Sequence, residues 1–219
     1  GGAIREIHRS PGLVEGLDWS PGGGQLAFSA REESGGFHAV RLLSLEDFGL
    51  GTLTLQGYGH TGMFQPKYSP DGTEVAWVGL GPSGRSGIFR SRLDDPEHRV
   101  VVIGHAPIQG LAWTPDGRFL VYASALNDRF TLWKAPVEGG DPRWIPTPGD
   151  FALNPSVARG TGDLVFEQVR IDQDIWRVRI LGRAPWQLGT DPFLASTRWE
   201  NEADFHPRGD RLAFVSSRS

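Results

Sequence analysis

The chain of 219 residues has no cysteine and a single methionine. Without cysteine it can form neither a disulfide framework nor a thiolate metal site. No apolar run approaches the length of a membrane span, and the first residues lack the hydrophobic core of a secretory signal. The net charge is −4 and no block of lysine and arginine stands out, so the basic face typical of a nucleic-acid-binding domain is missing.

Turn formers and bulky rings, by contrast, are abundant. The sequence holds 30 glycines, 16 prolines and 8 tryptophans, and 38% of its residues are hydrophobic. The glycines and prolines are spread along the chain, which predicts many short elements joined by tight turns. No segment keeps a helical period over ten or more residues, and the tryptophan content suits a rigid β core. The composition therefore predicts an all-β protein with a sizeable core.

A nine-residue pattern occurs five times, each copy joining a turn to a strand that ends in an aromatic residue. The aliphatic position of the pattern recurs at separations of 49, 45, 44 and 48 residues. A period in the mid-forties with β patterning is typical of a four-stranded propeller blade. The five copies are Ser20–Phe28, Ser69–Trp77, Thr114–Tyr122, a degenerate Ala158–Phe166, and His206–Phe214.

The turn of each copy has a physical rationale. In Ser69-Pro70-Asp71-Gly72, proline presets φ, the aspartate caps the local backbone, and glycine takes the left-handed conformation before the next strand. An aromatic residue precedes four of the five turns, so large side chains are expected to stack between neighbouring blades. These residues are Trp19, Tyr68, Trp113 and Phe205, with Val157 in the degenerate copy. Third strands are expected around Val40, Phe89, Trp133 and Trp176.

The repeated residues resemble the WD-like propeller repeat of TolB and its relatives over nearly the whole chain. This resemblance implies an all-β fold, a β-propeller of four-stranded antiparallel blades. Residues 172–219, with Asp174-Ile175-Trp176-Arg177, are similar to the propeller half of bacterial winged-helix transcriptional regulators. That similarity implies a sensory or partner-binding domain that does not itself contact DNA. The bacterial periplasm and the cytoplasm both stay open as its location, and we favour the periplasm.

We expect one propeller domain or fragment over residues 1–219. Residues Ile4–Ile7 read as the outer strand of a blade whose beginning is absent. The ends could combine into an incomplete blade that closes a five-bladed ring, but we favour an arc of a six- to eight-bladed ring. An open arc would expose two blade faces and could self-associate. The expected boundaries are a partial blade 1–9, blades of about 10–57, 58–105, 106–148 and 149–196, and a partial blade 197–219.

One rim of the propeller is the predicted binding surface. The loops between second and third strands and the loops between blades share this rim, where they collect polar and aromatic residues. Arginine together with tryptophan is typical of interaction hot spots, so the rim is predicted to bind a protein partner or a small ligand. A solvated polar rim is the alternative for each residue. The rim residues are Arg31, Glu32, His60, His105, Asn127, Asp128, Arg129, Arg170, Asp172, Arg198, Trp199 and Glu202.

Two motifs suggest ligands, but each has a simpler interpretation. His60 and His105 occupy equivalent loop positions, and we expect them to stabilise their loops, because equivalent positions in different blades lie far apart and no metal-binding pair accompanies them. Residues Gly79–Gly84 match a dinucleotide fingerprint, yet a strand follows where that fingerprint needs a helix. No metal and no cofactor is therefore expected.

Catalysis has little support in the sequence. A Gly-x-Ser-x-Gly elbow is absent, and the carboxylates near the inner strands form no pattern that fixes an acid and a base. These carboxylates are Glu15, Asp18, Glu200, Glu202 and Asp204. The leading interpretation is a non-catalytic binding propeller. The alternatives are the gating propeller of a prolyl-oligopeptidase-like serine peptidase, whose triad would lie outside these residues, and then a glycosidase.

Overall fold

The structure is a computed structural model. It describes residues 6–10, 12–31, 37–53, 62–81, 85–95, 97–104, 106–126, 129–148, 151–169, 200–205 and 212–216. Every regular element in these ranges is a β-strand, as the sequence predicts. Among these residues there is no helix with the length and apolarity to cross a membrane. The chain forms two compact units, residues 1–169 and 170–219, and each is described by itself.

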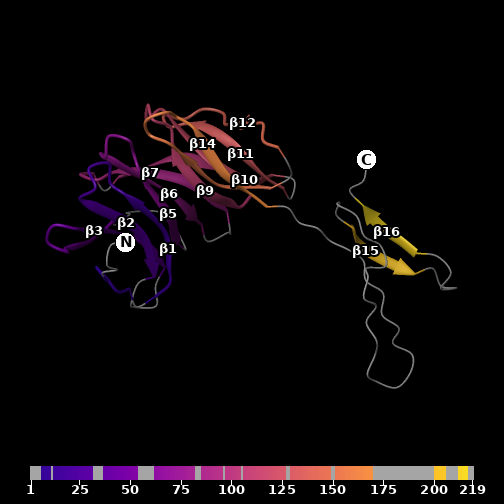
Figure 1. Cartoon of the computed structure of the whole chain (residues 1–219), viewed down its shortest axis with the longest axis horizontal. Coiled ribbons are helices and arrows are strands. Elements are labelled where there is room, and N and C mark those ends of the chain that lie inside the picture. Colours follow the sequence, from indigo (N-terminus) through magenta and orange to yellow (C-terminus); the bar gives the residue numbers. More distant parts are fainter. Residues whose placement is uncertain are drawn as a thin grey trace, which may run out of the picture. The chain divides into compact units, whose positions relative to one another are not determined.

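The first unit is a succession of antiparallel meanders (Figure 1). Within each meander a strand pairs with the next one along the chain, except that β13 and β14 form a single pair. The first blade contains β1 (Val14–Trp19), β2 (Gln25–Arg31), β3 (His38–Ser44) and β4 (Leu50–Thr52). The second contains β5 (Gly62–Tyr68), β6 (Glu74–Leu80), β7 (Ser86–Arg92) and β8 (His98–Ile103). The third contains β9 (Ile108–Trp113), β10 (Phe119–Leu126), β11 (Arg129–Pro136) and β12 (Arg143–Ile145), and the fourth begins with β13 (Ala152–Val157) and β14 (Leu164–Gln168).

The expected third strands are confirmed in the first three blades as β3, β7 and β11. The one expected around Trp176 lies outside the described residues. In the second unit, β15 (Glu200–Phe205) and β16 (Leu212–Ser216) form an antiparallel hairpin, which is the fifth copy of the repeat.

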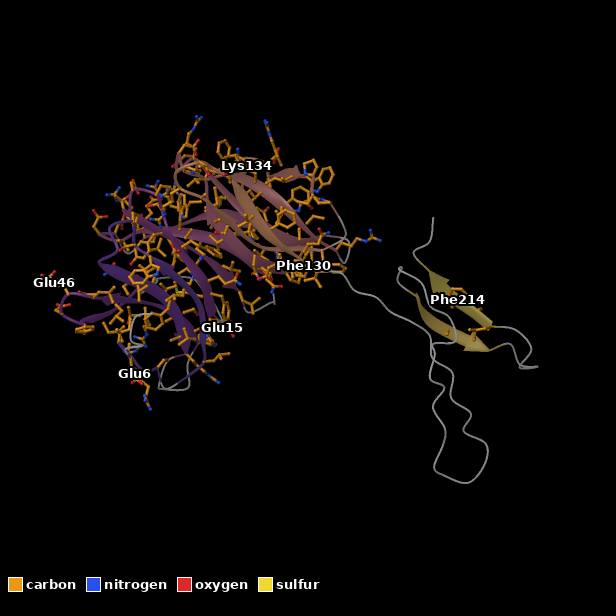
Figure 2. All side chains as sticks on the ribbon, viewed as in Figure 1. Glu6, Glu15, Glu46, Phe130, Lys134 and Phe214 are labelled. Atoms are coloured by element: carbon orange, nitrogen blue, oxygen red, sulfur yellow. The ribbon has the colours of Figure 1, made fainter. Side chains whose placement is uncertain are left out.

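The first strands of successive blades meet one another. Strand β1 contacts β5, β5 contacts β9, and β9 contacts β13, while each fourth strand lies at the outer edge of its sheet. Innermost strands that follow one another from blade to blade are the radial arrangement of a propeller. Side chains fill the space between the sheets of this unit (Figure 2).

Aromatic residues of the repeat form the cores between blades, as predicted. Tyr68 and Trp77 of the second blade pack against Ala27 and Val40 of the first. Trp113 and Tyr122 of the third blade do the same against the second, where they meet Ala76 and Ile88. Trp77 is fully buried. Burying one such side chain stabilises the fold by about 2–3 kcal/mol, so the junctions between blades carry much of the stability.

The predicted turn chemistry is confirmed in the second blade. Ser69 Oγ donates to Asp71 Oδ1 at 2.6 Å, and the Thr73 amide donates to the same oxygen at 3.0 Å. Gly72 has a φ of 74° and its amide donates to Ser69 O. Asp71 and Gly72 therefore have the roles that their types suggest.

The N-terminal segment differs from its prediction. Glu6 and Ile7 lie in no strand, although the sequence suggested an outer strand there. Glu6 instead pairs with Arg9 at 2.8 Å, three residues further along, and the His8 ring lies 5.5 Å from the ring of Phe28. Ile4 and Arg5, the first half of the predicted strand, lie outside the described residues.

Candidate binding site at the inner strand ends

Every first strand of the first unit bends at the same place in the repeat. The bend is a β-bulge whose central residue has positive φ. A bulge adds local twist and redirects the side chains beside it, and bulges are common near binding sites. The four central residues, with their φ values, are Gly16 (75°), Gln65 (53°), Gly110 (78°) and Asn154 (46°).

These bulges bring neighbouring blades into close contact. A Cβ placed on Gly16 would lie 2.6 Å from Gln65 Cα, and one on Gly110 would lie 2.5 Å from Asn154 Cα. Between these two pairs, the Gly110 amide donates to Gln65 Oε1 at 2.6 Å. The glycines are required because the next backbone occupies the space of a side chain. The inner strands are thus held tightly together at the level of the bulges.

Just beyond the bulges, the ends of the inner strands surround a hollow of about 70 Å³. Asp18, Lys67, Ala112 and Ser156 occupy equivalent positions in the four blades, each one residue before the end of its strand. We call this cavity the inner hollow. Its remaining lining consists of Tyr68, Pro70, Trp113, Pro115, Pro155, Val157 and Arg159.

Hydrogen bonds between blades fix the polar groups of the inner hollow. Asp18 Oδ2 accepts from the Tyr68 amide at 2.9 Å, and Lys67 Nζ lies 3.6 Å from Asp18 Oδ1. Lys67 Nζ also donates to Leu17 O at 3.2 Å. The Trp113 indole donates from Nε1 to Lys67 O at 3.0 Å. The hollow is therefore a preorganised polar site, because Asp18 and Lys67 are each held by the backbone of the other's blade.

Burial and the negative charge of Asp18 change the pKa of the neighbouring phenol, the side chain of Tyr68. Both raise the pKa of Tyr68 far above its ordinary value, with burial the larger cause. The phenol therefore stays protonated, and Tyr68 Oη donates to Gln25 Oε1 at 2.6 Å. This bond is a further tie between the first and second blades, and Tyr68 supplies no base to the hollow.

Arg159 completes the inner hollow from the fourth blade. Its Nη2 donates to Trp19 O at 3.1 Å, a contact between the fourth blade and the first. The side chain thus reaches across the ends of the inner strands. Together with Lys67 it gives the hollow two cationic groups.

A larger groove of about 340 Å³ opens between the second and third blades. At its base the buried Arg90 bonds Glu74 Oε1 at 2.7 Å in its own blade and Glu138 Oε1 at 2.8 Å in the next. The carboxylates of Asp71 and Asp116 line the same groove, and their turn hydroxyls, Ser69 and Thr114, lower the pKa of each. Because its charges are already engaged within the protein, the groove is a junction between blades.

Most of the predicted rim residues lie outside the described part of the chain. This holds for the side chains of Glu32, His60, His105, Asn127, Asp128, Arg170, Asp172, Arg198, Trp199 and Glu202. Arg31 and Arg129 are exposed, at the end of β2 and the start of β11. Both lie beside loops between second and third strands, where the sequence placed them. The rim as a binding surface stays a prediction.

The inner hollow was missed at the level of sequence, although two signals mark it. Lys67 and Ser156 occupy one repeat position that varies in charge from blade to blade. Arg159 occupies the place of a proline that the other four copies keep. A position that departs from the repeat indicates a role beyond packing. The prediction of the binding surface was instead built on the residues and loops that the copies share.

Comparisons with known proteins bear on the fold of the chain. No family model matches the chain. Dipeptidyl-peptidase 5 of Porphyromonas gingivalis is 26% identical over 144 residues, a match that covers 60% of this chain and 21% of that protein. The chain therefore spans about a fifth of the length of this curated relative.

Solved structures give the same fold. TolB from Acinetobacter baumannii matches with a TM-score of 0.62 and 13% identity, over 96% of this chain and 45% of that one. A putative TolB from Agrobacterium tumefaciens matches with a TM-score of 0.59 and 22% identity, over 97% of this chain and 73% of that one. At these identities the likeness concerns the fold alone. The chain has the fold of the TolB-type β-propellers.

Proposed function

We propose that this chain is a non-catalytic binding propeller within a larger bacterial protein. The observation that carries the proposal is the inner hollow, where the ends of four inner strands place Lys67, Arg159 and a serine hydroxyl around one cavity. Its only carboxylate among the described residues, Asp18, already accepts from a backbone amide and pairs with Lys67. Such a set is suited to holding a ligand, because hydrogen bonds between blades fix its charged groups in place.

The predicted rim is the second part of the proposal. We infer that it engages a protein partner or a small ligand through Arg198 and Trp199, which have hot-spot character. The parent protein would be a TolB-like envelope protein or a winged-helix regulator, with the propeller as its sensory or interaction domain. The TolB-type fold supports the first of these identities.

Affinity purification with matched variants tests the rim. The tagged chain would be used as bait in a bacterial extract, beside Arg198→Ala/Trp199→Ala and a control, Arg143→Ala/Trp144→Ala. The control removes an adjacent arginine and tryptophan from the outer strand β12, where both are exposed. We expect a co-purified protein to be lost with the rim variant and retained with the control. Equal retention by both variants would count against the rim.

A second candidate is the propeller domain of a serine peptidase. The sequence match to dipeptidyl-peptidase 5 favours it, since that match extends over 144 residues. In this case the propeller would control access to a catalytic domain in the same polypeptide, and the triad would lie in that domain. The test is amidase activity of the complete polypeptide on a dipeptide substrate. Activity that disappears when a serine outside these 219 residues is replaced would favour this candidate over the first.

A further inference from the structure

The inner hollow contains an arginine where the repeat otherwise has a proline. Arg159 aligns with Pro21, Pro70, Pro115 and Pro207, the second residue of each turn. Two of these prolines, Pro70 and Pro115, line the hollow beside Arg159. At this wall of the cavity the fourth blade therefore has a guanidinium where the other copies of the repeat have the apolar ring of proline.

The turn that carries Arg159 also differs in shape. In the first three blades the turn closes with a bond from the glycine amide to the carbonyl three residues before it, as from Gly72 to Ser69. In the fourth blade Gly162 donates to Ala158 O at 2.8 Å, four residues before it. The glycine has moved by one position, and the turn is wider. A wider turn without proline can present a long side chain over the strand ends.

Among the described residues, Arg159 uses only part of its hydrogen-bonding capacity. A guanidinium has five N–H donors in a planar fork, and one of them bonds Trp19 O. Among the described residues no carboxylate pairs with Arg159, which is exposed to solvent. The bond to Trp19 fixes the guanidinium at the hollow and leaves donors for a ligand. A planar fork of this kind suits a carboxylate, which accepts two parallel bonds.

The charge and the volume of the inner hollow narrow the class of ligand further. Lys67, Arg159 and Asp18 give the inner hollow a net charge of +1, which a monoanion would neutralise. A phosphate dianion would leave a negative excess beside Asp18. The volume of about 70 Å³ holds a group of a few heavy atoms but not a whole amino acid. Ser156 is exposed at the same cavity and can donate a further hydrogen bond.

We propose that the inner hollow binds a carboxylate group, carried by a small organic acid or by the C-terminus of a peptide. Arg159 makes the two-pronged contact, and Lys67 supplies the second positive charge. The rest of a peptide ligand would lie outside the cavity. This inference rests on the proposal that the inner hollow binds a ligand. The site is at the turn end of the inner strands and uses none of the predicted rim residues, so the inference stands or falls independently of the rim proposal.

The test is an NMR titration of the complete chain at constant ionic strength, with the Trp113 indole N–H as reporter. This group donates to Lys67 O inside the hollow, so its resonance responds to a bound ligand. It is assigned by its loss in Trp113→Phe. The probes are acetate, phosphate, trialanine and trialanine amide. The variants are Arg159→Gln, Arg159→Pro and Lys67→Gln. The matched control is Arg118→Gln, which removes an exposed arginine from the turn of the third blade, outside the hollow.

We expect saturable binding of acetate or trialanine, weakened at least tenfold in both Arg159 variants and about threefold in Lys67→Gln, with Arg118→Gln unchanged. Arg159→Pro restores the residue of the other copies, so the turn is expected to fold. Tighter binding of trialanine than of acetate identifies a peptide terminus as the source, and equal binding identifies a small acid. The proposal is overturned if the chemical shifts do not saturate with any carboxylate probe, or if phosphate binds more tightly than both carboxylates. It is also overturned if trialanine amide binds as well as trialanine while acetate does not bind. A loss of binding in Arg118→Gln as large as that in Arg159→Gln would overturn it too.

Discussion

The aromatic residue that ends the inner strand has a different environment in the first blade than in the second and third. Trp19 is 52% exposed, whereas Tyr68 is 2% and Trp113 is 7% exposed. The repeat position is the same, so the difference comes from the neighbour. Tyr68 bonds the first blade through Gln25, and Trp113 bonds the second through Lys67 O. No blade among the described residues precedes β1. A blade of this propeller is thus completed by the blade before it, as in other repeat proteins.

The largest expected effect tests this comparison directly. Trp113→Ala should lower the free energy of unfolding by about 3–5 kcal/mol, because it leaves a cavity between the second and third blades. Trp19→Ala should cost about 1 kcal/mol, since half of that side chain is already in water. Urea denaturation of both variants measures the difference. Equal losses would show that another element covers Trp19.

The next largest loss of stability is expected for Arg90, the buried arginine between the second and third blades. Arg90→Ala should destabilise the chain by about 3 kcal/mol, because it leaves the half-buried Glu74 without its partner. Arg92→Ala is the control, since Arg92 is half exposed and its ion pair among the described residues is with Asp94, two residues away. That surface pair should contribute little to stability, because solvent screens it. The same denaturation measurement applies, and a cost for Arg92→Ala as large as that for Arg90→Ala would contradict the assignment.

Much of the fold could be predicted from the sequence because the repeat specifies local structure. The turn around Asp71 and Gly72, the aromatic strand ends and the third strands all follow from residue types with strong conformational or packing preferences. Each blade repeats the same pattern of turn and strand residues, so five copies that are individually weak evidence together predict the fold strongly. The N-terminal residues Glu6 and Ile7 were misread because a short apolar pattern gives no information on whether a partner strand lies beside it.

The candidate site was beyond the reach of the same reasoning. Lys67 and Asp18 are 49 residues apart, and their contact depends on how two blades are placed around the axis. Arg159 and Trp19 are separated by 140 residues, with the second and third blades between them along the chain. The bulges at Gln65 and Asn154 have positive φ without glycine, which residue type alone does not predict. The partners of these polar side chains in other blades therefore require the structure, whereas the turns and strand pairs within a blade do not.

Gly110 and Gly23 both have a left-handed backbone, but Gly110 lies in a crowded inner position and Gly23 in an open one. Gly110→Ala places a methyl group 2.5 Å from Asn154 Cα, so the fourth blade must move, whereas Gly23→Ala meets nothing within 4 Å. Both substitutions carry the strain of positive φ, about 1 kcal/mol. We expect Gly110→Ala to cost about 2 kcal/mol in total and Gly23→Ala about 1 kcal/mol, measured by urea denaturation. A smaller loss at Gly110 would mean that the inner strands are less tightly held than the structure indicates.

The smallest effect concerns acid stability and compares the turns of the first two blades. Hydrogen bonds from Ser69 and then from the Thr73 amide hold the pKa of Asp71 below its ordinary value, while the first turn has Gly22 at the same position. Because the folded-state pKa is the lower one, this stabilisation is complete above the unfolded value, about 3.9, and is lost as the pH falls through the folded-state pKa. Asp71→Asn should therefore lower the melting temperature by about 1 °C at pH 7, with the difference becoming smaller as the pH falls through the folded-state pKa of Asp71. Thermal denaturation from pH 2 to pH 7, with Gly22→Asn as a matched change in the first turn, measures this. A gap that stays constant across that range would mean that the carboxylate charge does not stabilise the turn.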